Sequence, residues 1–141
     1  MKKVLLDTNV VLDFALKREP FYESAQIILN EIANGNAQGY VTASMATDIF
    51  YLLQKANGKT FAQNTFTDLV IILDVLTVYR ENVYSALRSG WGDFEDALQM
   101  QVAIHSGMDA IVTRNSKDFK KTQAMEIVLP DNFIKYLRNS S

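Results

Sequence analysis

Acidic residues stand where short apolar runs end or where helical patterns begin. Asp7 directly follows the apolar run of residues 4–6 in KKVLLDTNVVLDF. Further acids of this kind are Asp48, Asp93, Asp96 and Asp118. A carboxylate beside apolar residues is costly unless a helix N-terminus, a cation or water compensates its charge. If these acids meet, their oxygen atoms suit Mg²⁺ or Mn²⁺, and the absence of cysteine excludes thiolate metal sites.

Each acid also has an ordinary explanation. Asp7 can act as the N-cap of a helix that starts near Thr8. Asp93, followed by Asp96 at the third helical position, fits an N-cap as well. Asp13 lies six residues after Asp7, so it would face another side of a helix, and we expect it to be structural. The acids therefore indicate a metal site only if the fold brings their segments together.

Short apolar runs alternate with helical patterns along the chain. The predicted strands cover residues 4–6, 40–42, 76–79, 110–113 and 126–129. The predicted helices cover residues 21–34, 44–57, 61–73, 94–106 and 131–138. This alternation predicts an α/β fold, a three-layer α/β/α domain around a five-stranded parallel sheet.

The predicted fold would bring the acids together. Segments that leave the carboxyl ends of neighbouring parallel strands converge on one edge of the sheet, where ligands bind. Two unit charges about 4 Å apart repel by roughly 4 kcal/mol at an effective dielectric constant of about 20. A cluster of carboxylates at this edge therefore requires protonation or a neutralising cation.

The composition is that of a globular protein. The 141 residues are 48% hydrophobic and 21% charged, which predicts a single domain covering residues 1–141. The N-terminal apolar run is too short for a signal peptide and no run approaches a membrane span, so we expect a cytoplasmic protein without a membrane partner. The net charge of −2 is not the basic footprint of a typical nucleic-acid binder, although it permits an enzyme with an acidic site.

Three segments, VLLDTNVVLDF, DFEDALQMQVA and AIVTRNSKDF, resemble the PIN-domain family. They follow the family's order and spacing, and the resemblance extends from residue 3 to residue 129. The most similar group is the VapC-like toxins of type II toxin–antitoxin modules. The resemblance implies a Mg²⁺- or Mn²⁺-dependent endoribonuclease that hydrolyses RNA phosphodiester bonds. It also implies an antitoxin protein as partner and a homodimer, for which the helix at 61–73 is one candidate surface.

The resemblance assigns the acidic site residue by residue. The family's four acidic positions fall, in order, on Asp7, Asp48, Asp96 and Asp118. Asp93 and Asn115 are secondary candidate ligands beside the third and fourth positions. Asp48 replaces the more usual Glu and reaches one methylene less, while Asn115 stands where some members have Asp. The polar neighbours that would orient the ligands are Thr8, Asn9 and Thr113.

Basic and aromatic residues near the predicted site could contact RNA. The candidates for phosphate binding are Arg114, Lys117, Lys120 and Lys121. For each one taken alone, a solvated surface loop is the ordinary explanation. Trp91 and Tyr51 could stack on a base, although packing is the more ordinary role. His105 falls in the last turn of its helix, where it suits the helix dipole rather than catalysis.

Two other classes of function remain open. A PIN domain weakened by its departures at Asp48 and Asn115 would bind RNA or protein without cleaving RNA. A non-nucleolytic phosphohydrolase would also place an acid after the first strand, but Asp7-Thr8-Asn9 lacks the Asp-x-Asp pattern of haloacid dehalogenases. No Gly-rich phosphate loop occurs in the sequence, so a nucleoside triphosphatase is not expected.

Overall fold

The computed structural model describes residues 1–119 and 125–139, in which five parallel strands form one sheet. The strands are β1 (Lys3–Leu6), β2 (Gln38–Thr42), β3 (Asp74–Leu76), β4 (Ala110–Val112) and β5 (Glu126–Val128). Their order across the sheet is β3-β2-β1-β4-β5, and every neighbouring pair is parallel. The predicted α/β fold with a five-stranded parallel sheet is confirmed.

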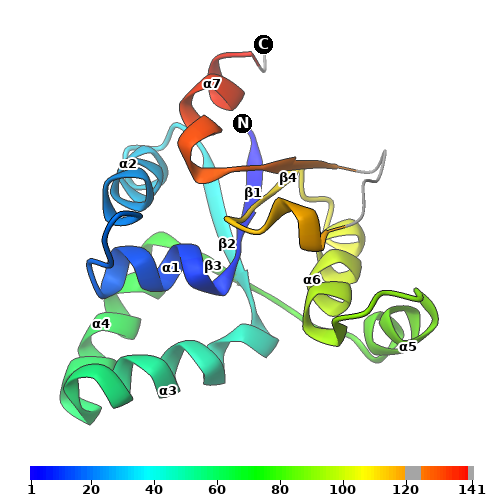
Figure 1. Cartoon of the computed structure of the whole chain (residues 1–141), viewed down its shortest axis with the longest axis horizontal. Helices are drawn as coiled ribbons and strands as arrows, with labels where there is room; N and C mark the ends of the chain where they lie inside the picture. The colour runs from blue at the N-terminus through cyan, green and yellow to red at the C-terminus, as the bar shows by residue number, and fades with distance from the viewer. Residues whose placement is uncertain (120–124, 140–141) are drawn as a thin grey trace.

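Helices cover both faces of this sheet (Figure 1). The α-helices are α1 (Thr8–Ala15), α2 (Tyr22–Ala33), α3 (Ala46–Asn57), α4 (Lys59–Ile72), α5 (Arg80–Arg88), α6 (Phe94–His105) and α7 (Phe133–Arg138). Short 3-10 turns are η1 (Ala43–Met45), η2 (Ser116–Asp118) and η3 (Pro130–Asn132). Helices α1 to α4 lie on one side of the sheet, and α5 and α6 lie on the other (Figure 1).

The central strands β1 and β4 are buried on both faces. Val4, Leu5 and Leu6 of β1 are fully buried, and so are all three residues of β4. Such runs of consecutive buried apolar residues are typical of parallel strands that carry helices on both sides. The main hydrophobic core joins these strands to the helices around them, and a smaller cluster joins α5 to α6.

The strand order reverses between β1 and β4. Leu6 pairs with Val112 in the register of these strands. The Asp7 backbone N–H continues the ladder by donating to the Val112 carbonyl oxygen at 3.0 Å. Asp7 and Thr113 therefore leave the sheet side by side. Ligands of doubly wound sheets bind in the crevice that opens at such a switch in strand order.

The segment after α4 differs from the sequence prediction. The third strand is Asp74–Leu76 rather than residues 76–79, and an unpredicted helix, α5, follows it. The Tyr79 backbone N–H donates to Asn82 Oδ1 at 2.8 Å, which caps the start of α5. The buried residues of α5 are Asn82 and Ala86, one polar and one small. The helix therefore fully buries no large apolar side chain, although its apolar residues fall on one face.

Candidate active site

Asp7 is the buried centre of the site, with 7% of its surface exposed. Its Oδ1 atom accepts hydrogen bonds from the Thr8 backbone N–H at 2.8 Å and from Gln99 Nε2 at 3.2 Å. Its Oδ2 atom accepts a hydrogen bond from the Thr113 hydroxyl at 2.8 Å. All three donors are neutral, so they hold the carboxylate in place without cancelling its charge.

The end of β1 and the start of α1 fix the position of Asp7. Asp7 is the N-cap of α1 and has an extended backbone, with φ −66° and ψ 154°. The positive end of the α1 dipole stabilises a carboxylate at this position. Capping is therefore a real role of Asp7, but the hydrogen bonds from Thr113 and Gln99 reach it from two other segments of the chain.

A cavity of about 430 Å³ opens beside Asp7. Six carboxylates line it: Asp7, Asp48, Asp93, Glu95, Asp96 and Asp118. The other lining residues are Thr8, Asn9, Tyr51, Leu52, Gln99 and Asn115. None of these described lining residues carries a positively charged side chain. The fold thus gathers acids from four separate parts of the chain around one volume, to which the described residues contribute no positively charged side chain.

Three elements bring the other predicted acids to the cavity. Asp48 lies in the first turn of α3, and Asp118 lies in η2 after β4. Asp93 is the N-cap of α6, where its Oδ1 atom accepts a hydrogen bond from the Asp96 backbone N–H at 3.0 Å. Asp48, Asp93 and Asp118 are exposed, whereas Asp96 is only partly exposed. The structure therefore brings together the acids that the sequence pattern selected.

The polar neighbours named from the sequence also lie at this edge. Thr8 and Asn9 line the cavity at the start of α1. Thr113 is fully buried, and its hydroxyl oxygen accepts a hydrogen bond from the Asn115 backbone N–H at 3.1 Å while it donates to Asp7. The Asn9 side-chain oxygen accepts a hydrogen bond from Arg18 at 3.2 Å. These contacts fix the rim of the cavity around Asp7.

Sequence reasoning missed two residues that line the cavity, Glu95 and Gln99. Glu95 stands between Asp93 and Asp96 in the first turn of α6, and the sequence pattern assigned it no role. Gln99 follows Asp96 by three residues, which places the two side chains on one face of α6. That spacing was visible in the sequence, but an amide in a buried helix carries no signal of a site until its contacts are known.

Burial and mutual repulsion change the acidity of this cluster. Burial raises the pKa of Asp96 to about 7, and the nearby carboxylates, first Asp93 and then Asp7, contribute to the same shift. Burial also raises the pKa of Glu95, with Asp48 the largest electrostatic contributor. Both shifts have the sign expected of carboxylates that share a site without a cation.

The donor atoms of the cavity match a hard divalent cation. They are carboxylate and amide oxygens, which Mg²⁺ and Mn²⁺ prefer. One of them, Gln99 Oε1, is buried and accepts no hydrogen bond from residues 1–119 or 125–139. In the part of the chain that the structure describes, however, no three acidic or histidine side chains lie close enough together to form a ready-made ion site. The residues fit such an ion chemically, and the exposed acids would have to turn inward to share it.

Asp13 is also buried, with 1% of its side chain exposed, but it lies in a different environment. Its Oδ1 atom is 3.0 Å from Arg18 Nε, and its Oδ2 atom is 2.8 Å from Arg114 Nε. The Arg114 guanidinium also lies 3.8 Å from the centre of the Phe21 ring. Asp13 therefore has two cationic partners and does not line the acidic cavity, in line with the structural role expected for it.

The predicted phosphate-binding residues are only partly described. Arg114 contacts Asp13 and Phe21, so its guanidinium is already engaged within the chain. Lys117 is exposed in η2, next to Asp118. Lys120 and Lys121 lie outside the described residues. Their contact with RNA stays a prediction.

The aromatic and histidine candidates have separate environments. The Trp91 ring packs edge-on against Phe119, with 5.8 Å between the ring centres. Tyr51 lines the acidic cavity and is 61% exposed, so its ring is accessible to a ligand. His105 lies in the last turn of α6, where it stacks on Tyr79 at 4.9 Å between ring centres. His105 is not among the residues that line the cavity.

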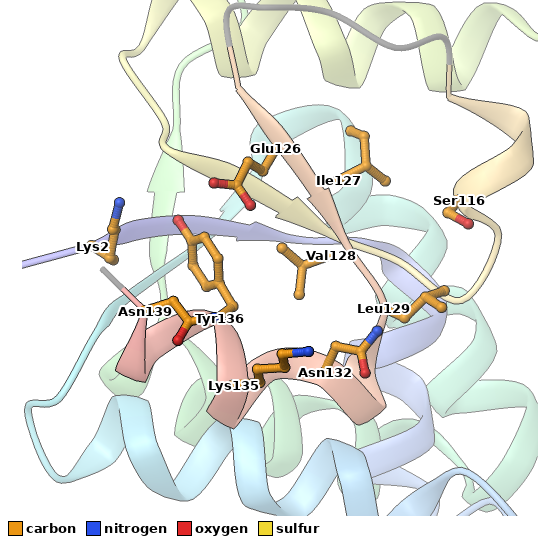
Figure 2. A pocket seen from close by; sticks show the side chains of 10 residues that line it. All are labelled: Lys2, Ser116, Glu126, Ile127, Val128, Leu129, Asn132, Lys135, Tyr136 and Asn139. Carbon is orange, nitrogen blue, oxygen red and sulfur yellow. The ribbon is translucent and has the colours of Figure 1, made fainter. Parts of the chain in front are cut away.

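A second cavity, of about 440 Å³, lies between β5 and α7 (Figure 2). The side chains of Lys2, Glu126, Lys135 and Tyr136 line it, so both signs of charge are present. Burial, with smaller contributions from Asp109 and Glu126, raises the pKa of Tyr136 to about 12. None of the acids predicted from the sequence lines this cavity, and its mixed charge favours no particular ligand.

The described helices include none that is long and apolar enough to cross a membrane. The fold and the site together define an α/β protein with a carboxylate-rich cavity at the switch in strand order. The family model of the PIN domain matches residues 3–117, most of the chain. The chain therefore belongs to the PIN-domain family, and the resemblance seen in the sequence is confirmed.

Solved structures with the same fold include a toxin–antitoxin complex and a toxin. One similar structure is that of VapBC2 from Rickettsia felis bound to a DNA fragment from the promoter. Its TM-score is 0.70 and its sequence identity is 19%, and the match covers 90% of this chain and 98% of that chain. A toxin–antitoxin complex from Klebsiella pneumoniae has a TM-score of 0.69 and 20% identity, covering 90% and 97%. VapC20 from Mycobacterium tuberculosis, described as a sarcin-ricin loop cleaving toxin, has a TM-score of 0.61 and 14% identity, covering 77% and 86%. No curated protein sequence matches significantly.

Proposed function

We propose that this chain is a ribonuclease that hydrolyses RNA phosphodiester bonds with the aid of Mg²⁺ or Mn²⁺. The observation that carries the proposal is the gathering of six carboxylates around one cavity without a positively charged lining residue among those described. Membership of the PIN-domain family supports the reaction type. Asp7, Asp48, Asp96 and Asp118 are the residues that would hold the cation, with Asp93 and Asn115 as secondary ligands.

When bound, the cation would acidify a water molecule and neutralise charge on the attacked phosphate. The chain's own residues prepare the site for this. Thr8, Thr113 and Gln99 fix both oxygen atoms of Asp7. Tyr51 offers an exposed ring at the rim on which a base can stack. Charged carboxylates repel an RNA phosphate, so we expect cation binding to accompany substrate binding.

Cleavage of RNA by the purified chain tests this proposal. Wild type, Asp7→Asn and Asp68→Asn are compared with EDTA, Mg²⁺ or Mn²⁺. Asp68 is an exposed acid of α4 outside the cavity, so Asp68→Asn is a matched control. We expect cleavage only with the metals and a loss of roughly 100-fold or more in Asp7→Asn, as several kcal/mol of charge stabilisation would give.

Other outcomes of this experiment would contradict the proposal. Equal cleavage by wild type and Asp7→Asn would place the activity elsewhere. RNA binding without cleavage under any metal would identify a module that has lost catalysis. Hydrolysis of a small phosphomonoester but not of RNA would identify a phosphohydrolase.

We further propose that the chain is the toxin of a type II toxin–antitoxin module. The similarity of its fold to VapBC2 and to the Klebsiella pneumoniae complex supports an antitoxin partner. The test is whether a small protein encoded beside this gene binds the chain and stops RNA cleavage. If the neighbouring genes encode no such protein, a stand-alone role in RNA processing is favoured.

The homodimer stays a prediction. On α4, the candidate surface, Ile71 is 78% exposed and Val70 is 42% exposed, so this helix presents apolar area to solvent. Light scattering on wild type and Ile71→Glu measures whether this substitution changes the oligomeric state. A dimer that becomes monomeric in Ile71→Glu would place the contact on α4, and an unchanged dimer would place it elsewhere.

A further inference from the structure

Gln99 is a polar residue in a buried part of α6. It is 5% exposed, and its neighbours Ala97, Leu98 and Met100 are buried as well. A buried amide is unfavourable unless both its donor and its acceptor are used. The side chain nevertheless lines the acidic cavity, one helical turn after Asp96.

The hydrogen bond to Asp7 determines which way the amide of Gln99 points. Its Nε2 atom donates to Asp7 Oδ1 at 3.2 Å. The reversed amide would place Oε1 against the carboxylate, two acceptors facing each other, so this orientation is enforced. Gln99 Oε1 is then left buried without a hydrogen-bond partner among the described residues.

The surroundings restrict what Gln99 Oε1 can bind. The cavity beside it is lined by six carboxylates, which are acceptors like Oε1 itself. An anion would be repelled by those carboxylates. The missing partner is therefore a hydrogen-bond donor that also tolerates strong negative charge, such as a hydrated divalent cation.

We propose that Gln99 is a positioning residue of the cation site. Through Nε2 it holds Asp7, and through Oε1 it accepts a hydrogen bond from a water molecule of the bound cation. This inference rests on the proposed cation-dependent function and adds to it a neutral oxygen that belongs to no acidic motif. Mg²⁺ keeps several of its waters in protein sites, so an acceptor for such a water has a defined use.

The test compares wild type, Gln99→Met and the control Gln101→Met. Methionine has nearly the shape of glutamine but neither donor nor acceptor of comparable strength. Gln101 lies on the same helix but not at the cavity. Mn²⁺ dissociation constants are measured by electron paramagnetic resonance and calorimetry, and melting temperatures are measured in EDTA.

We expect Gln99→Met to weaken Mn²⁺ binding by about 10- to 100-fold, the usual effect of losing an outer-shell partner. Its melting temperature in EDTA should stay close to that of wild type, because removal of an unsatisfied buried oxygen offsets the loss of the hydrogen bond to Asp7. Gln101→Met should bind Mn²⁺ like wild type. If Gln99→Met lowers the melting temperature in EDTA but leaves the Mn²⁺ constant unchanged, Gln99 is purely structural and the inference is wrong.

Gln99→Glu gives a second measurement in case the methionine variant does not fold. It keeps the acceptor but replaces the donor to Asp7 with a negative charge. We expect a lower melting temperature than wild type in EDTA and a larger gain than wild type on addition of Mn²⁺. An equal gain in both proteins would contradict the inference. If wild type itself binds no Mn²⁺, the proposed function fails, whereas normal binding by wild type and by Gln99→Met overturns only the role of Gln99.

Discussion

Two aspartates of one helix, Asp7 and Asp13, have opposite surroundings. Both are almost fully buried, Asp7 at the N-cap of α1 and Asp13 within it. Asp13 lies at ion-pair distance from Arg18 and Arg114. Within the described residues, Asp7 accepts side-chain hydrogen bonds from neutral donors alone, and it faces a cavity lined by other acids. The chain compensates the charge of Asp13 with its own arginines, whereas the described neighbours of Asp7 are neutral or acidic.

The arginine partners of Asp13 also contact or adjoin residues that line the acidic cavity beside Asp7. Arg18, which is paired with Asp13, donates to the Asn9 side-chain oxygen at 3.2 Å, and Asn9 lines the acidic cavity. Arg114, the other partner, directly precedes Asn115, which lines it too. The Asp13 ion pairs therefore tie the end of α1 and the segment after β4 to one another behind the site.

The largest difference between the two aspartates should appear in stability. Asp13→Asn should lower the free energy of unfolding by about 2–4 kcal/mol, because it leaves two arginines beside a buried neutral group. This expected loss of stability is smaller than the loss for a fully buried ion pair, because both arginines are partly exposed. Asp7→Asn should change it by less than about 1 kcal/mol in EDTA, since its partners are neutral. Urea unfolding in EDTA measures both, and equal losses would erase the distinction.

The two arginines should contribute unequally to that stability. The Arg114 side chain is 24% exposed, whereas that of Arg18 is 37% exposed. Arg114 also contacts the Phe21 ring and both side-chain oxygens of Asp13. We expect Arg114→Gln to cost about 1–2 kcal/mol and Arg18→Gln about 1 kcal/mol or less. Arg114→Lys should recover only part of the loss, because lysine lacks the planar fork. Urea unfolding of the three variants checks the order, and a larger loss in Arg18→Gln would contradict it.

An external cation should stabilise the protein through Asp7 and not through Asp13. At ten times its dissociation constant, Mn²⁺ should add about 1.4 kcal/mol to the free energy of unfolding. Melting temperature in a Mn²⁺ titration measures this gain. It should be present in wild type and Asp68→Asn and absent in Asp7→Asn. An undiminished gain in Asp7→Asn would show that the ion binds elsewhere.

Much of the fold and the candidate site followed from sequence pattern. The apolar runs of β1 and β4 are unusually clear because both faces of these strands are buried. Once those strands are parallel neighbours, Asp7 and Asn115 must leave the sheet at the same edge. The position of Asp13 six residues after Asp7 was enough to predict that it faces another side of the helix. Its ion pairs with Arg18 and Arg114 agree with the structural role expected for it.

Other parts of the fold and the site depend on side-chain contacts that the pattern of apolar and polar residues does not reveal. Helix α5 starts at a cap made by Asn82, a residue three positions inside the helix, so no preceding Ser, Thr or Asp marked it. Gln99 became part of the site only when its amide was seen to reach Asp7 from another segment. The engagement of Arg114 by Asp13, 101 residues away, was equally invisible in the sequence.

The smallest expected effect is the response of the metal-free site to pH. Asp96 has a pKa of about 7 in the folded protein against an ordinary value of 3.8. Between these values the folded state holds a proton that the unfolded state has released, so stability falls as pH rises towards and through 7. Because Asp96 is partly exposed, the change from pH 6 to pH 8 should stay below about 1 kcal/mol. Unfolding in EDTA at both pH values should show this decline in wild type and a flatter response in Asp96→Asn, since the amide does not titrate. Parallel declines in the two proteins would mean that other groups cause it, and that the acids around Asp7 do not crowd Asp96 as the structure indicates.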